Sequence, residues 1–171
     1  MRYMTWAAVP LMLLAACSKS PETAAAPSAA PQLSFEGYGP VHFGAQLADV
    51  ERQLNTKSQP LGANDPACSM VRFADIPGVR FMVEQGKITR ADADAGIGNT
   101  LGIATGDTLE AAKKKAPTLQ VGAHKYLPEG HYLSASSADG KAAIIMEEDG
   151  KSITKIRAGL QPAVAYVETC L

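Results

Sequence analysis

The chain has 171 residues and almost balanced charge, with 16 basic and 17 acidic side chains. This balance, without a basic stripe, excludes the electrostatic footprint of a nucleic-acid-binding protein. The one basic run, Lys113-Lys114-Lys115, is typical of a helix end, where cations interact favourably with the helix dipole. A polybasic patch that binds anionic lipids is the alternative, but such patches usually contain more than three lysines.

Residues 1–16 have the organisation of a secretory signal peptide. Arg2 supplies a positive charge, and an uncharged stretch of eleven residues follows from Trp6 to Ala16. This stretch is too short to span a bilayer as a helix, which needs about 20 residues. It matches the apolar region of an export signal, which has about 7–15 residues and precedes small residues at a cleavage site. The stretch ends in Leu14-Ala15-Ala16-Cys17.

That tetrapeptide resembles the lipobox of bacterial lipoproteins. The resemblance implies cleavage before Cys17, a thioether to diacylglycerol on its sulfur and an acyl chain on the new α-amine. Several chains give stable anchoring, because one acyl chain binds a membrane only marginally. An ordinary signal peptide with a coincidental cysteine is the alternative. Ser18 is not the aspartate that retains such proteins at the inner membrane of enterobacteria, so we expect the outer membrane, facing the periplasm.

Residues 17–32 predict a lipidated N-terminus and a tether. Residues 18–32 read SKSPETAAAPSAAPQ and contain no aliphatic side chain larger than alanine. Such a segment cannot bury enough apolar surface to offset its chain entropy. We therefore expect a signal peptide at 1–16, a tether at 17–32 and one folded domain at 33–171.

The folded part contains two similar stretches in the same order, which predict repeat units at about 37–99 and 100–171. Gly44 aligns with Gly106, and each glycine is followed by apolar residues on one face of a short amphipathic helix. These apolar residues are Leu47, Val50 and Leu54 in the first copy and Leu109, Ala112 and Ala116 in the second. Chance similarity between two short stretches is the alternative.

A side-chain cap is expected only on the second helix. Asp107 and Glu110 have the spacing of a capping box, in which two side chains bind free backbone N–H groups. Ala45 occupies the position of Asp107 in the first copy. The first helix is therefore expected to begin without such a cap.

Each helix is expected to precede three antiparallel strands. The first strands are predicted near 69–74 and 131–136, and the others form hairpins that turn at Gln85-Gly86 and Asp149-Gly150. Ser152 is an extra residue in the second hairpin, which is typical of a β-bulge. A last short strand is expected near Ala163–Glu168. The prediction is an α+β fold in which two tandem helix–β–β–β units form one antiparallel sheet with both helices on one face.

The order of glycine, short helix and hairpin resembles the unit of BamE-type lipoproteins and of the tandem-repeat β-lactamase inhibitor protein. The former are single-unit subunits of the outer-membrane barrel-assembly machine. The latter is secreted, has two units and binds its target enzyme across a concave sheet. The resemblance extends from about Gly37 to Ala158 and implies this fold, whereas function does not follow from fold alone.

Two cysteines remain once Cys17 carries lipid. Cys68 and Cys170 would lie in an oxidising compartment, where one disulfide is the most economical outcome. It would close a loop of about 100 residues, which the chain-entropy model credits with ~4.7 kcal/mol. A metal site is the alternative, but two cysteines at this spacing and three histidines do not support one.

The sequence contains no recognisable catalytic or cofactor motif. There is no Gly-x-Ser-x-Gly and no phosphate-binding loop. Residues 92–96, Asp-Ala-Asp-Ala-Gly, resemble the start of a calcium loop, but the later ligands are missing. Alternation instead predicts Arg90, Asp92 and Asp94 on the wet face of a strand. We expect no cofactor, no bound metal and no catalysis.

Residues 124–132 concentrate two tyrosines and two histidines in a chain with few aromatic residues. Tyr126, His131 and Tyr132 are the candidate partner-binding residues, because tyrosine offers a large contact area with only two χ angles. The alternative is that the tyrosines cover the edge of the core. A further alternative is a zinc site, and its ligands would be His124, Glu129 and His131.

The sequence therefore predicts a non-catalytic binding or scaffold module that acylated Cys17 anchors to the outer membrane. Its expected partner is another envelope protein, bound through the sheet face or the 124–132 loop. Two alternatives stay open. The two-unit resemblance suggests an inhibitor of a hydrolase in the periplasm, and a small envelope hydrolase is the third possibility.

Overall fold

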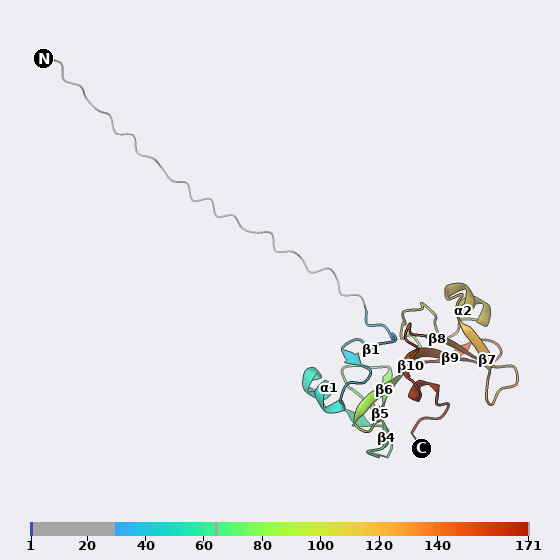
Figure 1. Ribbon diagram of the computed structural model, residues 1–171, viewed down its shortest axis with the longest axis horizontal. Helices are drawn as coiled ribbons and strands as arrows, with labels where there is room; N and C mark the ends of the chain where they lie inside the picture. The colour runs from blue at the N-terminus through green and yellow to red at the C-terminus, as the bar shows by residue number, and fades with distance from the viewer. Residues whose placement is uncertain (2–29, 64, 171) are drawn as a thin grey trace.

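The computed structural model describes residue 1, residues 30–63 and residues 65–170. Within these ranges the fold is mixed α+β, with one large antiparallel sheet of eight strands, a separate two-stranded hairpin and two short helices (Figure 1). The expected signal peptide beyond Met1, most of the tether and Cys17 lie outside the described residues. In the described part of the chain, no helix is long and apolar enough to cross a membrane.

The first half of the chain contains β1 (Gly37–Tyr38), β2 (Val41–His42), α1 (Leu47–Leu54), β3 (Gln59–Pro60), β4 (Cys68–Arg72), β5 (Val79–Glu84) and β6 (Lys87–Ala93). The second half contains α2 (Leu109–Lys115), β7 (Gln120–Ala123), β8 (His131–Ser136), β9 (Ala142–Glu148), β10 (Ile153–Leu160) and η1, a turn of 3₁₀ helix at Ala163–Ala165.

The strands of the large sheet lie in the order β3-β4-β5-β6-β10-β9-β8-β7. Each helix therefore precedes four strands, whereas three were expected. The unexpected strands, β3 and β7, are short and form the two edges of the sheet. The last strand of the first set, β6, pairs antiparallel with the last strand of the second set, β10.

The entries to α1 and α2 are tied to the sheet by the same contacts. Gly44 donates its N–H to the carbonyl of Ile88 at 2.7 Å, and Gly106 donates to the carbonyl of Ile153 at 2.8 Å. Ile88 and Ile153 each donate in return to the residue that follows the glycine. Both glycines have positive φ, 85° and 94°, a conformation that other residues rarely adopt.

The cap of α2 differs from the expected capping box. Thr108 is the N-cap residue, and its hydroxyl accepts a hydrogen bond from the amide three residues later at 3.2 Å. The prediction that Asp107 and Glu110 form the box is wrong, because the Asp107 carboxylate accepts from the Ala104 N–H and from Lys115 instead. These two bonds hold the pKa of Asp107 below its ordinary value. Helix α1 has no side-chain cap.

The two central hairpins have different turns. The β5–β6 hairpin turns at Gln85-Gly86, as expected, and both residues have positive φ. The two-residue turn expected at Asp149-Gly150 is wrong, because the Asp149 carboxylate accepts two backbone N–H groups and closes a connection over 149–152. The irregularity expected at Ser152 lies inside β10 instead, where the pairing of β10 with β9 shifts register between residues 153 and 155.

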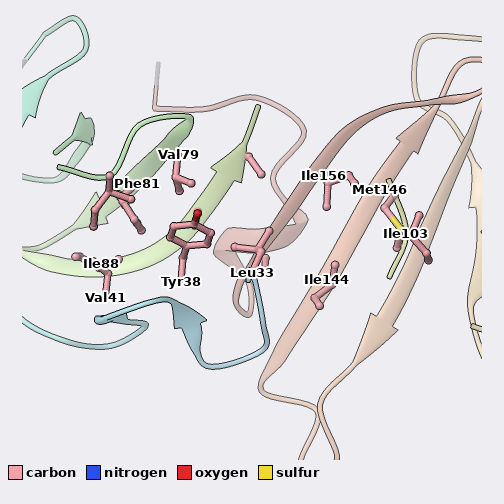
Figure 2. Close-up of a cluster of buried hydrophobic side chains, with 14 of the residues drawn as sticks. Leu33, Tyr38, Val41, Val79, Phe81, Ile88, Ile103, Ile144, Met146 and Ile156 are labelled. Carbon is pink, nitrogen blue, oxygen red and sulfur yellow. The ribbon is translucent and has the colours of Figure 1, made fainter. Parts of the chain in front are cut away.

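One face of the sheet packs against both helices. Val50 of α1 and Ala112 of α2 belong to the same buried cluster as Phe81 of β5 and Ile144 of β9. Figure 2 shows side chains of this cluster extending from the sheet strands toward the segment that carries Leu33 and Tyr38. Leu33 is fully buried, so the core extends at least as far as this residue on its N-terminal side.

The C-terminal segment, residues 161–170, crosses the opposite face of the sheet. The strand expected near 163–168 is wrong, because this segment forms η1 and then a bend at 167–168. Two of its carbonyl groups accept hydrogen bonds from arginines of the sheet. Arg157 Nε donates to the Val164 carbonyl, and an Arg90 terminal nitrogen donates to the Tyr166 carbonyl, both at 2.8 Å.

The same crossing corrects the expectation for Arg90. The alternation of β6 predicts a wet face for Arg90 and Asp92, but the Arg90 side chain is only 3% exposed. The C-terminal segment covers it, and Asp92 pairs with it at 2.6 Å. The end of the segment is joined to β4 by a disulfide between Cys170 and Cys68, whose Cα atoms are 5.4 Å apart.

Candidate binding surface

The loop between β7 and β8, residues 124–130, meets the C-terminal segment. The Tyr126 hydroxyl donates a hydrogen bond to the Glu168 carboxylate, and Lys125 Nζ lies 2.9 Å from the same oxygen. Both donors stabilise the charged carboxylate, and they lower the pKa of Glu168 to about 2. The same contacts, with Tyr126 first and Glu168 second, raise the pKa of Lys125. Two segments that are about 40 residues apart in the chain are therefore joined at Glu168.

The loop is folded around the ring of His124. His124 Nδ1 accepts from the backbone N–H groups of Tyr126 at 3.1 Å and Leu127 at 3.2 Å. The His124 ring stacks on the Tyr132 ring, with centroids 4.5 Å apart. At the end of the loop, Gly130 packs closely against β9. A Cβ at this position would lie only 2.6 Å from the Glu148 carbonyl oxygen. These contacts hold the backbone of the loop in place beneath its exposed side chains.

A buried charge network lies beneath the loop. The Glu147 carboxylate pairs with Arg157, with Lys155 at 3.0 Å and with the His124 ring, whose Nε2 is 3.7 Å away. Burial would raise the pKa of Glu147, but the hydrogen bonds from Arg157 and Lys155 outweigh it and hold this pKa below its ordinary value. A general acid works best with a pKa near the operating pH. The network is therefore suited to holding structure rather than to transferring protons.

Tyr132 lies between this network and a small hollow. Its hydroxyl is buried and has no hydrogen-bond partner among the described residues. The hollow beside it has a volume of about 210 Å³ and is bounded by β8, β9, β10 and the C-terminal segment, with Ile145, Ala165 and Val167 in its walls. The tyrosine ring therefore covers part of the sheet face, as in the alternative interpretation of this residue.

His131 is separated from the two tyrosines by the sheet. Glu147 and Glu148 are consecutive in β9, so their side chains point to opposite faces. His131 Nδ1 lies 2.9 Å from Glu148 Oε2, whereas Tyr132 is on the face of Glu147 and the C-terminal segment. The three candidate residues therefore do not form one surface.

The same separation bears on the zinc alternative. His124 faces Glu147 and His131 faces Glu148, so the two rings lie on different faces. Within residues 30–63 and 65–170, no three histidine, cysteine or acidic side chains are grouped to hold a metal ion.

Three apolar side chains of the loop and of the C-terminal segment are exposed. Tyr126 is 60% exposed, Leu127 41% and Tyr166 42%. Together we call them the aromatic surface. Sequence reasoning identified Tyr126 but missed Tyr166, because residues 163–168 were assigned to a strand. The sequence signal for Tyr166 was a tyrosine, a residue type that is often partly exposed, in a short apolar run after Pro162.

Comparisons of the chain with protein families, with curated proteins and with solved structures find no match.

Proposed function

We propose that this chain is a lipoprotein of the bacterial outer membrane that binds another envelope protein through the aromatic surface. The anchoring part rests on the sequence, where Leu14-Ala15-Ala16-Cys17 follows an export signal. Acylated Cys17 would hold the folded domain at the periplasmic side of the membrane through the residues up to 32. The module acts by binding and not by catalysis.

The observation that carries the binding proposal is the fixed exposure of Tyr126. The residue is 60% exposed, while its hydroxyl is held by Glu168 and its backbone N–H by His124. A ring that is already held in place loses little entropy on binding, and tyrosine is enriched at the energetic centres of interfaces. Leu127 in the same loop and Tyr166, two residues before Glu168, add further exposed apolar side chains.

We also propose that the fold consists of two tandem units that diverged from one repeat. The support is the pair of glycine contacts at Gly44 and Gly106, which bind corresponding strands with the same two backbone hydrogen bonds. The order of strands adds to it, since β3 to β6 and β7 to β10 run inward from opposite edges and meet at β6 and β10. This arrangement keeps the resemblance to the two-unit inhibitor open, and a hydrolase in the periplasm is then one class of partner.

The sheet face itself is the weaker candidate for the interface. The C-terminal segment lies across it and occupies Arg90 and Arg157. A partner that bound the bare sheet would first have to displace this segment and its disulfide. The aromatic surface needs no such displacement.

Affinity capture from crosslinked envelopes tests the binding proposal. The double variant Tyr126→Ala/Tyr166→Ala should lose the partner, since removing a central interface tyrosine weakens binding by about 2 kcal/mol or roughly 30-fold. Val121→Ala is the matched control, because Val121 is similarly exposed, at 41%, but lies on the edge strand β7 outside the aromatic surface. Tyr126→Phe keeps the ring but loses the bond to Glu168 that holds it, so it should bind the partner more weakly than wild type and more tightly than the double variant. Equal capture by the double variant and the control would contradict the proposal.

Metabolic labelling tests the anchor. Wild-type chain should incorporate labelled palmitate, and Cys17→Ala should not. Palmitate that remains on Cys17→Ala would rule out the proposed lipid attachment, whatever the outcome for the aromatic surface.

A further inference from the structure

A second hollow lies at the other end of the sheet from the β7–β8 loop that carries Tyr126. Figure 1 shows β4 and β5 with α1 at one end of the fold and β7 with α2 at the other. The hollow has a volume of about 430 Å³ and lies where β3, β4 and β5 meet the connection between β4 and β5. Gln59, Arg72, Arg80 and Asp94 provide its polar groups, and Ile76 and Pro77 contribute apolar wall.

The two arginines are neighbours across the β4–β5 ladder. Val71 pairs with Phe81, so the next residues outward, Arg72 and Arg80, come together on the face opposite the helices. Like charges on neighbouring strands destabilise a sheet. An anion bound in the hollow would offset this repulsion.

The protein itself offsets this charge only in part. Arg72 has no carboxylate within ion-pair distance among the described residues, and its Nε donates to Gln59 Oε1 at 3.2 Å. Arg80 lies 3.3 Å from Asp94, and both side chains are about half exposed, at 49% and 58%. An exposed pair of this kind contributes little to stability and exchanges easily with another anion.

The other arginines of this face show the contrast. Arg90 is paired with Asp92 and with the Tyr166 carbonyl, and Arg157 is paired with Glu147 and with the Val164 carbonyl. Their donors are used by the fold. Arg72 lines the hollow, and among the described residues its one side-chain hydrogen bond is the bond to Gln59.

We propose that this hollow binds a small organic oxyanion, a phosphate ester or a carboxylate. The guanidinium groups of Arg72 and Arg80 donate to its oxygens, since a planar fork matches both kinds of anion. The Gln59 amide holds Arg72 through its oxygen and has its NH₂ group left as a further donor. The apolar part of the ligand packs on Ile76 and Pro77. This site is separate from the aromatic surface, and its test does not depend on the proposed function.

Isothermal titration calorimetry on the full chain in a non-ionic detergent provides the test, with phenyl phosphate, benzoate and inorganic phosphate as probes. We expect saturable binding of phenyl phosphate or benzoate, and the tighter of the two identifies the anionic group. Inorganic phosphate should bind at least threefold more weakly than phenyl phosphate, because it lacks the apolar part. No saturable binding of any probe would overturn the proposal, and equal affinity for the two phosphates would overturn its organic part.

Variants locate the site. Arg72→Gln and Arg80→Gln should each weaken binding tenfold or more, whereas Arg52→Gln should leave it within twofold. Arg52 is the matched control because its side chain is 76% exposed on α1, away from the hollow. Asp94→Asn should strengthen binding, because it removes the carboxylate that competes for Arg80. A gain in affinity cannot be explained by a variant that fails to fold. Equal weakening by Arg52→Gln, or unchanged or weaker binding by Asp94→Asn, would contradict the assignment.

Discussion

Arg157 on β10 and Glu147 on β9 form an ion pair in which the two side chains are only 3% and 4% exposed. Arg157 also donates to the Val164 carbonyl, so the pair supports the C-terminal segment as well as the sheet. Water cannot replace either partner at this site. The stability of the face that carries the aromatic surface therefore depends on both charges.

Removal of Glu147 should be strongly destabilising. Glu147→Ala leaves Arg157 charged and buried, which typically costs about 3–5 kcal/mol of unfolding free energy. Urea unfolding at neutral pH measures this loss. Asp49→Ala is the control, because it breaks an ion pair with Arg52 whose side chains are 59% and 76% exposed, and such pairs contribute less than about 1 kcal/mol. Similar losses in the two variants would show that the Glu147 pair is not effectively buried.

The same pair predicts an acid limb of stability. The folded-state pKa of Glu147 lies below the ordinary value of 4.5. A group with a depressed folded pKa contributes its stability above the unfolded pKa and loses it as the pH falls through the folded pKa. Wild type should therefore exceed Glu147→Gln in unfolding free energy at pH 6, and the difference should narrow below pH 4.5. A difference that stays constant or widens in acid would contradict the assigned pKa direction.

The contact between the loop and the C-terminal segment can be measured at Glu168. Nuclear magnetic resonance titration of this carboxyl should give a pKa of about 2 in the wild type. Tyr126→Phe removes the hydroxyl, which has the largest effect, so the pKa of Glu168 should rise toward 4.5. An ordinary pKa in the wild type would mean that Tyr126 and Lys125 do not hold the segment in solution.

The sequence predicts the parts of the fold that local signals determine. β8 has the bounds expected near 131–136, because its alternation ends at a turn. The Gln85-Gly86 turn was predictable because both residues accept positive φ. The Cys68–Cys170 bond follows from the count of cysteines and is present in the structure.

Long-range contacts explain what the sequence did not reveal. The sequence pattern predicts that Arg90 in β6 is exposed to solvent. Its burial depends on the segment of Tyr166, which lies 76 residues later in the chain. Residues 163–168 form an apolar run that was expected to be a strand, but the sheet ends at β3 and β7, and arginines of the sheet bind the Val164 and Tyr166 carbonyl groups. His131 and Tyr132 are adjacent in the strand expected at 131–136, so their opposite faces follow from the sequence, whereas their partners Glu148 and Glu147 are given by the pairing of β8 with β9.

Gly159 should be essential for the junction between the two sets of strands. It pairs with Arg90 across β6 and β10, and a Cβ there would lie 2.5 Å from the Thr89 carbonyl oxygen. Gly159→Ala should therefore lower the unfolding free energy by about 1–3 kcal/mol, as overpacking does. Gly122→Ala in β7 is the matched control, since a Cβ there meets nothing within 4 Å. Equal stability of the two variants would contradict the close approach of β6 and β10.

Site-specific photocrosslinking in living cells tests the proposed partner surface most directly. A photoreactive residue at Tyr166 should give one adduct of defined mass, because this position lies inside the aromatic surface. The same residue at Glu110, which is exposed on α2, should give none. Absence of an adduct at position 166, or the same adduct at both positions, would contradict the account.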